Sequence, residues 1–570
     1  MNLLFVDLYI EIWPNSMPTA LVAENYVSKG HRVHYLNCDG RLSSFCIAMS
    51  SRGLNRNSNP SELSSTCSSC RKRRNLVQKE FAFEQHILEQ LINDKDEKKI
   101  EEIIRSTTSD NWSEVVLDEI NVGQVAAYEF FLEKKFISSI IPSKFFNEYL
   151  ERLENTIVVY IACKKLIESN DIDAVFTYNG LYSTNRVSLL CANELGKQAW
   201  SLHAGSHLEK KYSTLSMYRF DTLPVRAYES PQWVRAKEQP LSIERIALVE
   251  THIQRLIRAT NNFVYSTKGG VHDEEQIRQI LGIKDGAKVL VATMSSGDEF
   301  LAAQLAGLLP KEPTLPTLFA DASEWISWLI NAVGEIPNIH LIVRVHPREF
   351  PNKRESVESY NVVRLRSLFE EVPSNVTINW PSDGISLYDL AKITDLTLNS
   401  TSTAGLEMSL LGVPVLLHDT EFMLAYDPNI NTVCSSKLEY RNMILHLVGQ
   451  RKSIEHTRKA FRWLAFVFSD VQIDISDGFS YPSDGFLSNR KGVVDSIRNS
   501  VLKNLQRYLP PIYERKQLRN RSFLRNGLLF ESILHQVDPI LIRPSESSNI
   551  SEADETVELE LAVNRLFSLL

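Results

Sequence analysis

The apolar positions at the start of the chain form short blocks that predict alternating strands and helices. Residues 2–8 (NLLFVDL) form an apolar block of strand length, residues 17–30 have helical spacing and end at Gly30, and residues 31–37 (HRVHYLN) form a second strand-like block. A short apolar block bounded by turn residues is typical of a strand buried in a sheet. This β-α-β opening predicts a doubly wound α/β sheet.

The alternation of strand-like and helix-like blocks is interrupted after residue 43 and returns near residue 173. Residues 43–74 are rich in Ser, Asn and Arg, so we expect a loop or small insertion there, and residues 81–168 have mostly helical spacing. Residues 173–180 and 198–205 read as strands around a helix at 185–196, and each strand ends in a small polar loop. Ligands of open α/β sheets bind in the crevice beyond the carboxyl ends of the strands. Both loops are therefore candidates for a binding site.

A second α/β unit begins near Ala287. Residues 288–299 read as a strand followed by a Ser/Gly loop, residues 323–336 as an amphipathic helix, and residues 339–349, 375–380, 395–400 and 414–417 as further strands. A chain of 570 residues is too long for one hydrophobic core. We expect a first domain over 1–260 with an insertion at about 38–80, a second over 261–480, and a helical extension over 481–570.

Charge and hydropathy restrict the location and the partners. The net charge of −8 argues against a nucleic-acid partner, because proteins that bind nucleic acids usually carry an excess of basic residues. No uncharged apolar window approaches the ~20 residues of a membrane span, and the first residues lack a basic signal-peptide region. We expect a cytoplasmic protein. The basic residues 503–525 could contact the inner face of the membrane, or pack back on the first domain.

Four of the seven cysteines crowd one short segment. Cys38, Cys46, Cys67 and Cys70 lie within it, and the last two have the C-x2-C spacing of zinc sites. In a reducing compartment, four thiolates in one insertion favour a structural Zn²⁺ ion. Free thiols and an iron–sulfur centre are the alternatives.

A run of hydroxyl residues interrupts residues 396–417 (LTLNSTSTAGLEMSLLGVPVLL). Ser400, Thr401 and Ser402 stand between a strand-like block and a helix-like one, where hydroxyls and the helix N-terminus together suit a phosphate. Glu407, about one helical turn later, could accept the hydroxyls of a ribose. The alternative is an ordinary Ser/Thr cap on a core helix.

A second motif lies about fifty residues upstream, where residues 344–349 (RVHPRE) end an apolar strand at His346 and Pro347. Together with residues 380–417, this motif resembles the C-terminal half of GT-B glycosyltransferases, in particular the bacterial capsule-polysaccharide biosynthesis group. That group includes Kdo transferases and is distantly similar to sialyltransferases. Its His-Pro pair and its later Ser/Thr pair bind the nucleotide phosphate, usually of a CMP-activated sugar. The resemblance covers residues 288–417, with His346 and Pro347 matching the first pair and Ser400–Ser402 the second.

The resemblance implies two Rossmann-like domains facing a cleft, and a metal-independent transferase. The donor would be CMP-Kdo or a related CMP-sugar, and the acceptor a surface polysaccharide or a lipid-linked glycan. A metal is not expected in catalysis because protein groups would stabilise the leaving phosphate. A glycerophosphotransferase or a sugar-nucleotide epimerase of the same fold, and a noncatalytic capsule or envelope assembly protein, are the alternatives.

The resemblance also places a catalytic carboxylate in the first domain, as general base or nucleophile. Asp39 is the first candidate, because sialyltransferase-like enzymes use an acidic residue before a glycine and Asp39 precedes Gly40. Asp7, at the end of the first strand, and Glu24 are the others. For Asp39 a simple turn role is the alternative.

Several further residues are expected at the cleft. Ser295 and Ser296 follow the first strand of the second domain and are expected to contact the nucleotide or the donor sugar. Asn179 and His203 lie in the two loops of the first domain, and Arg186 could pair with a sugar carboxylate. The alternative for these three is turn chemistry and an ordinary surface arginine.

Overall fold

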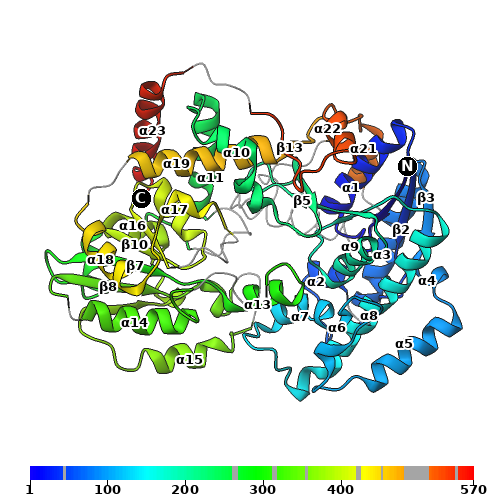
Figure 1. The fold of residues 1–570 in the computed structure, drawn as a ribbon, viewed down its shortest axis with the longest axis horizontal. Coiled ribbons are helices and arrows are strands. Elements are labelled where there is room, and N and C mark those ends of the chain that lie inside the picture. Colours follow the sequence, from blue (N-terminus) through cyan, green and yellow to red (C-terminus); the bar gives the residue numbers. More distant parts are fainter. Residues whose placement is uncertain are drawn as a thin grey trace, which may run out of the picture.

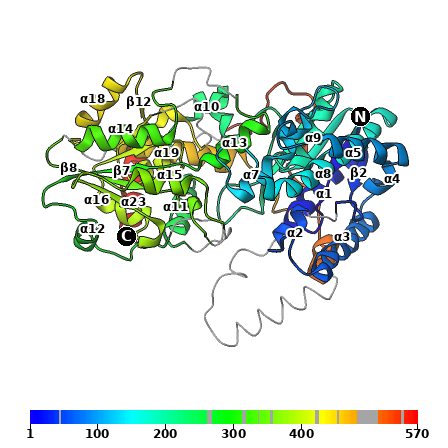
Figure 2. The same cartoon turned by 90° about the horizontal axis from the view of Figure 1, so that it is seen from below.

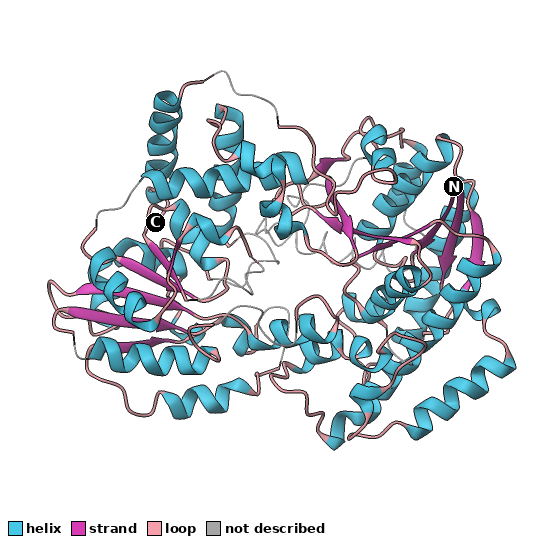
Figure 3. Cartoon of the chain, in the orientation of Figure 1, coloured by secondary structure: helices cyan, strands magenta, loops and turns pink. Residues whose placement is uncertain are grey.

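The computed structural model describes residues 1–42, 46–259, 267–310, 317–334, 336–352, 357–418, 425–450, 454–479, 512–545 and 550–570. These residues build two largely parallel β-sheets, each covered by helices (Figures 1 and 3). The expected α/β architecture with two Rossmann-like domains is confirmed.

The first sheet has seven strands in the order β13-β6-β5-β4-β1-β2-β3. Strand β1 lies inside the sheet and pairs in parallel with β2 and β4, whereas near one edge β6 pairs antiparallel with both β5 and β13. Strands buried on both faces need continuous apolar runs, as residues 3–6 provide. The strands are β1 (Asn2–Val6), β2 (Arg32–Asn37), β3 (Glu84–Ile87), β4 (Ala174–Tyr178), β5 (Gln198–Ala204), β6 (Thr214–Arg219) and β13 (Ile473–Asp474).

The second sheet has six strands in the order β12-β11-β10-β7-β8-β9, and all of its pairings are parallel. Strand β7 lies between β10 and β8, so the loops that follow these three strands open at the same edge. The strands are β7 (Lys288–Thr293), β8 (Ile339–Arg344), β9 (Val376–Asn379), β10 (Leu396–Asn399), β11 (Val415–Leu417) and β12 (Thr432–Val433).

Helices cover both faces of the first sheet. Leu3 and Phe5 pack in one core cluster with α1, whereas Leu4 and Val6 pack in another with α8, because alternate residues of a strand point to opposite faces. The helices that precede β7 are α1 (Trp13–Ser28), α2 (Ile47–Ser51), α3 (Pro60–Glu80), α4 (Leu88–Leu91), α5 (Asp94–Ser106), α6 (Val122–Ala126), α7 (Tyr128–Lys134), α8 (Ser143–Ser169), α9 (Ser183–Glu194), α10 (Pro231–Ala236), α11 (Ile243–Ile257) and α12 (Glu274–Ile280).

The helices after β7 surround the second sheet and extend the chain beyond it. They are α13 (Gly297–Leu305), α14 (Ala322–Gly334), α15 (Asn361–Leu368), α16 (Leu387–Ile393), α17 (Ala404–Leu410), α18 (Lys437–Leu447), α19 (Ile454–Phe466), α21 (Ile512–Arg519), α22 (Gly527–Ser532) and α23 (Glu552–Phe567). No helix of the described residues combines the length and the apolar character needed to cross a bilayer.

The expected loop-rich insertion is wrong, because residues 60–80 form the long helix α3. Asn59 caps this helix by accepting from the Ser61 amide, and Pro60 occupies its first turn, a strong helix start that the Ser-rich composition obscured. The mostly helical interpretation of residues 81–168 also missed β3, whose four residues (EQHI) carry too little apolar signal to be recognised as a strand.

The C-terminal extension divides between the two domains (Figures 1 and 2). Trp13 Nε1 donates to Gln517 Oε1 at 2.8 Å, so α21 packs on the first domain. Helix α23 instead packs on α11 and α19 beside the second sheet, where Arg462 and Glu555 form a buried ion pair of 2.6 Å. The described part of the basic segment therefore packs on the first domain, which was one of the two expectations; residues 503–511 lie outside the described residues.

Helices α10 and α11, expected in the first domain, share a core cluster with α17, α19 and α23 of the second. The chain then returns to the first sheet at β13. The expected division of the chain at 260 and 480 stays a prediction, and these contacts show that neighbouring segments pack across both positions.

Candidate functional site

One cavity of about 160 Å³ opens at the edge of the second sheet where β7, β8 and β10 end. Its lining includes both motifs singled out in the sequence, with His346 and Pro347 from the loop after β8, Ser402 from the loop after β10, and Glu407 from α17. Arg344, Tyr388 and Thr403 also contribute. The lining residues are Leu256, Thr293, Met294, Arg344, Val345, His346, Pro347, Leu387, Tyr388, Ser402, Thr403, Ala404 and Glu407.

His346 is held in one protonation state. Its Nδ1 accepts a hydrogen bond from the Arg348 amide at 3.3 Å at the start of the short helix Pro347–Glu349. Burial, together with the neighbouring cationic Arg348, lowers the pKa of His346 to about 4. The neutral ring must then carry its proton on Nε2, which makes that atom a hydrogen-bond donor at neutral pH.

Arg344 supplies the positive charge of the cavity. It ends β8, and its Nη1 donates to Asn379 Oδ1 at 2.5 Å and to the Ile385 carbonyl at 3.0 Å. Burial lowers its pKa to about 10, which leaves the guanidinium cationic at neutral pH. In the sequence, the only signal for a role of Arg344 is an arginine at the end of a largely apolar strand, two residues before His346.

Glu407 also lines the cavity, and its carboxylate interacts electrostatically with Arg344. It accepts from Tyr388 Oη at 2.7 Å and from Thr403 Oγ1 at 3.0 Å. Burial raises the pKa of Glu407, while these two hydrogen bonds and the charge of Arg344 lower it. The cavity thus combines a cationic wall with an acidic one.

The hydroxyl run is divided between three tasks. Ser400 Oγ lies 3.1 Å from His418 Nε2 behind the cavity, and Thr401 forms 3.0 Å hydrogen bonds to Ser295 through its amide and its hydroxyl. Ser402 lines the cavity and accepts from the Ala404 amide at 3.3 Å. Ser400, Thr401 and Ser295 therefore tie loops together, whereas Ser402 and the unpredicted Thr403 face the cavity.

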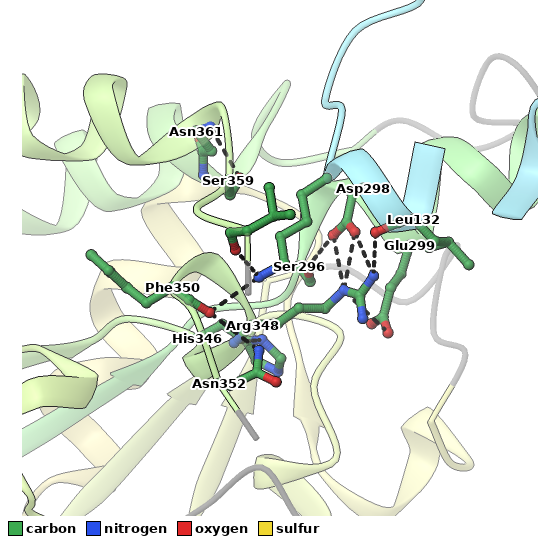
Figure 4. A network of polar contacts seen from close by, with 12 residues as sticks. Leu132, Ser296, Asp298, Glu299, His346, Arg348, Phe350, Asn352, Ser359 and Asn361 are labelled. Carbon is green, nitrogen blue, oxygen red and sulfur yellow. Dashed lines mark hydrogen bonds and ion pairs between the residues drawn. The ribbon is translucent and has the colours of Figure 1, made fainter. Parts of the chain in front are cut away.

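Beside the cavity, the two domains are joined by buried cations (Figure 4). Arg348 donates to both oxygens of Asp298 and reaches the Leu132 carbonyl of α7 at 3.0 Å. Ser296 bonds to the same aspartate, so its hydroxyl belongs to this network. Lys135 donates to the carbonyls of Phe350 and Val357 at 3.1 and 2.6 Å. The loop that carries His346 is thereby fastened to the first domain.

Arg186, expected to meet a sugar carboxylate, joins the same interface instead. It is 2% exposed, and its guanidinium donates to the carbonyls of Ala306 at 2.8 Å and of Phe220 and Gly307. Its hydrogen bonds thus join α9 to the end of α13. Arg186 thus holds the two domains together. The sequence gives no sign of this role, because the carbonyls that it contacts are far away along the chain.

The two loops of the first domain show turn chemistry. Asn179 has a φ of 55°, and its carbonyl accepts from Asn185 Nδ2. His203 lies 3.0 Å from the Ala204 carbonyl through Nδ1, and burial lowers its pKa. Neither residue lines the cavity described above, which matches the turn alternative.

The three expected catalytic carboxylates lie in different environments. Asp7 follows β1, is 9% exposed, and accepts from Ser16 Oγ at 2.9 Å and Tyr35 Oη at 2.8 Å. Burial raises the pKa of Asp7 to about 6, despite both hydrogen bonds. Asp39 is partly exposed and pairs with Arg74 at 3.1 Å, and Glu24 pairs with Arg521 of the C-terminal extension at 3.0 Å. A pKa near neutrality suits a general base, which favours Asp7.

The four expected zinc ligands lie in one region without forming a compact group. Burial raises the pKa of all four thiols, and the charge of Cys46 contributes to raising the pKa of Cys38 and of Cys70. Among the described residues, the group whose potential ligand atoms all lie within 4.8 Å of one another is a different one, and it contains no cysteine. Zinc binding by Cys38, Cys46, Cys67 and Cys70 stays a prediction.

Comparisons with known proteins place the chain near sugar-nucleotide enzymes only at low similarity. No protein-family model and no curated protein matches the sequence. Among solved structures, the UDP-GlcNAc 2-epimerase of Neisseria meningitidis bound to UDP-GlcNAc is 12% identical, with 88% of this chain and 100% of that chain covered and a TM-score of 0.27. KpsC of Thermosulfurimonas dismutans, a β-Kdo 2,4 transferase, is 15% identical, with 51% and 79% covered and a TM-score of 0.30. These values assign no activity to the chain.

Proposed function

We propose that the protein is a glycosyltransferase that binds a nucleotide-activated sugar in the cavity of the second domain. The observation that carries this proposal is the joint lining of one cavity by Arg344, His346 and Glu407, with hydroxyls beside them. A ligand that fits it needs an anionic part and a hydroxyl-bearing part next to each other. A nucleotide phosphate with its ribose has both.

Each lining group would have a defined task. The guanidinium of Arg344 and the Nε2–H of His346 would stabilise the phosphate as its leaving-group charge develops. Glu407 would accept the ribose hydroxyls, a role its two existing donors already prepare by fixing the carboxylate. Because the cavity is smaller than the ~300–1,000 Å³ of typical ligand pockets, we assign it the phosphate and ribose only.

The chemical step requires a base near the acceptor. Displacement at the anomeric carbon transfers the sugar to an acceptor hydroxyl, whose proton must leave to a carboxylate. We propose Asp7 for this role in place of Asp39, because burial brings the pKa of Asp7 to about 6. The favoured donor is CMP-Kdo or a related CMP-sugar, by resemblance of the two motifs, and the acceptor a surface or lipid-linked glycan. A requirement for a catalytic metal is not expected.

A nucleotide-binding assay tests the proposal. Thermal-shift measurements with CMP, CDP, UDP and GDP should show stabilisation by CMP, and His346→Ala should remove it by deleting the Nε2–H donor. His203→Ala, a buried histidine outside the cavity lining, serves as control and should leave the response intact. A shift with UDP or GDP alone would refute the CMP assignment, and an unchanged response of His346→Ala would refute the site.

Turnover separates the transferase from its rivals. Consumption of a CMP-sugar only in the presence of a glycan acceptor supports transfer. Conversion of a nucleotide sugar without any acceptor would instead identify an epimerase, and binding without turnover across donors and acceptors a noncatalytic assembly protein.

A further inference from the structure

The outer edge of the first sheet brings two histidines and a glutamate together. Strand β3 forms this edge and pairs in parallel with β2, with His34 opposite Glu84 and Leu36 opposite His86. Residues two apart on a strand share a face, so the three polar side chains project from the same face of the sheet. They lie in the first domain, whereas the candidate nucleotide site lies at the second sheet.

The three side chains approach closely. His34 Nδ1 lies 3.0 Å from His86 Nε2 and 3.7 Å from Glu84 Oε1, and the third side of the triangle, from His86 Nε2 to Glu84 Oε1, is 4.0 Å. Ligand atoms about 2.0–2.2 Å from a tetrahedral Zn²⁺ ion lie roughly 3.4 Å from one another. The observed triangle brackets that separation, so an ion needs only small side-chain adjustments.

We propose that His34 Nδ1, His86 Nε2 and Glu84 Oε1 bind one divalent transition-metal ion of the Zn²⁺ type. Two imidazoles and one carboxylate are a donor set that such ions prefer, and three protein ligands leave a coordination position for water. The ion would fasten the short edge strand β3 to β2.

The surroundings prepare these ligands. Arg32 donates to Glu84 Oε2 at 2.8 Å from Nε and 2.6 Å from Nη2, which orients the carboxylate and leaves Oε1 toward the histidines. The side chain of His34 is fully buried and that of His86 is 17% exposed, so the two rings meet at the inner side of the triangle. Glu84 is 39% exposed, and the ion can therefore enter from the solvent on the carboxylate side.

One feature limits the affinity. Without metal, a single proton lies between His34 Nδ1 and His86 Nε2; with metal on Nδ1, His34 must carry its proton on Nε2. That nitrogen is buried and has no hydrogen-bond partner in the described part of the chain. Metal-ligating histidines normally donate their second N–H, and losing that partner costs roughly 10–100-fold in affinity. We therefore expect reversible binding that a chelator removes readily.

Cobalt titration tests the site on the full-length protein after chelator treatment. Co²⁺ should bind with visible absorption bands typical of nitrogen and oxygen ligands, and Zn²⁺ should displace it. His86→Ala and Glu84→Gln should each weaken this binding at least tenfold. Melting curves without metal should match the wild type, and added Zn²⁺ should raise the melting temperature of the wild type only.

Two controls separate this site from its alternatives. The Cys67→Ser/Cys70→Ser double variant should retain the Co²⁺ signal, because no sulfur takes part. His535→Ala, with a side chain that is 68% exposed, should bind like the wild type and excludes surface-histidine binding. Unchanged affinity in His86→Ala overturns the proposal. So does a thiolate-to-metal charge-transfer band that accounts for all bound Co²⁺ and disappears in the cysteine variant, or the absence of Co²⁺ binding.

Discussion

The substitution Asp7→Asn separates a functional carboxylate from a structural one. The side chain is buried between β1 and α1, with Ser16 and Tyr35 donating to its two oxygens. Asparagine has nearly the same shape and keeps one acceptor oxygen, so the packing should survive. The variant removes a carboxyl group whose ionisation is unfavourable because the group is buried away from water.

The size of the expected stability change follows from the pKa of the Asp7 carboxyl, which is ordinarily 3.8 and is about 6 in the folded protein. Between these values the folded state binds more protons than the unfolded state, so the stability contributed by this group falls as pH rises and is constant above pH 6. About two pH units at 1.36 kcal/mol each give a cost of ~3 kcal/mol at pH 8. The variant avoids this cost but loses one hydrogen bond, which is worth ~1 kcal/mol. Asp7→Asn should therefore be about 2 kcal/mol more stable than the wild type at pH 8 and about equally stable at pH 4.5.

Urea unfolding of both proteins at pH 4.5, 6 and 8, monitored by tryptophan fluorescence, measures this difference. Asp39→Asn is the matched control, because the carboxylate of Asp39, 37% exposed in its ion pair with Arg74, is screened by solvent and its loss should change stability by about 1 kcal/mol or less at every pH. A variant that is less stable at pH 8, or whose difference from the wild type does not change with pH, would refute the reasoning. If Asp7 is the base, the more stable variant should also lose transfer activity, and wild-type kcat/KM should fall below pH 6.

Substitutions at three further positions test the site and the interface. Glu407→Gln should weaken nucleotide binding about 10–100-fold in calorimetry by removing a charged acceptor, whereas equal affinity would exclude contact with the ribose. Tyr388→Phe, which removes one of the two donors to Glu407, should weaken binding less, and a larger loss than in Glu407→Gln would contradict the assigned order. Arg186→Met leaves buried carbonyls unpaired and should cost roughly 2–5 kcal/mol in urea unfolding, while Arg186→Lys should recover part of that loss; wild-type stability of Arg186→Met would argue against the interface role.

The local pattern was sufficient for most strands and for two motifs that line one cavity. Residues 2–6, 32–37 and 288–293 are strands as the apolar blocks predict, and the hydroxyl run and the His-Pro pair follow β10 and β8, which lie on either side of β7 in one sheet. Both results depend on short-range information: burial on two faces demands an apolar run, and parallel strands present their carboxyl ends at one edge of a sheet.

Local sequence signals are misleading for helix α3 and weak for strand β3, and neither element was predicted. Helix α3 carries Ser, Cys and Arg in place of an apolar stripe, and its ion pairs stabilise it instead, as when Arg73 contacts Glu514 of α21 at 2.7 Å. Strand β3 is a strand because β2 pairs with it, since its own four residues have little preference for that conformation.

By itself, the sequence determined the α/β class, the order of most elements and the two motifs that meet at the cavity. Only the tertiary structure decided which side chains face the cavity, that Arg186 joins the domains, and that His34 and His86 meet across an edge strand. The physical reason is distance along the chain: periodicity and turn chemistry act over a few residues, whereas these contacts join segments 52 to more than 100 residues apart.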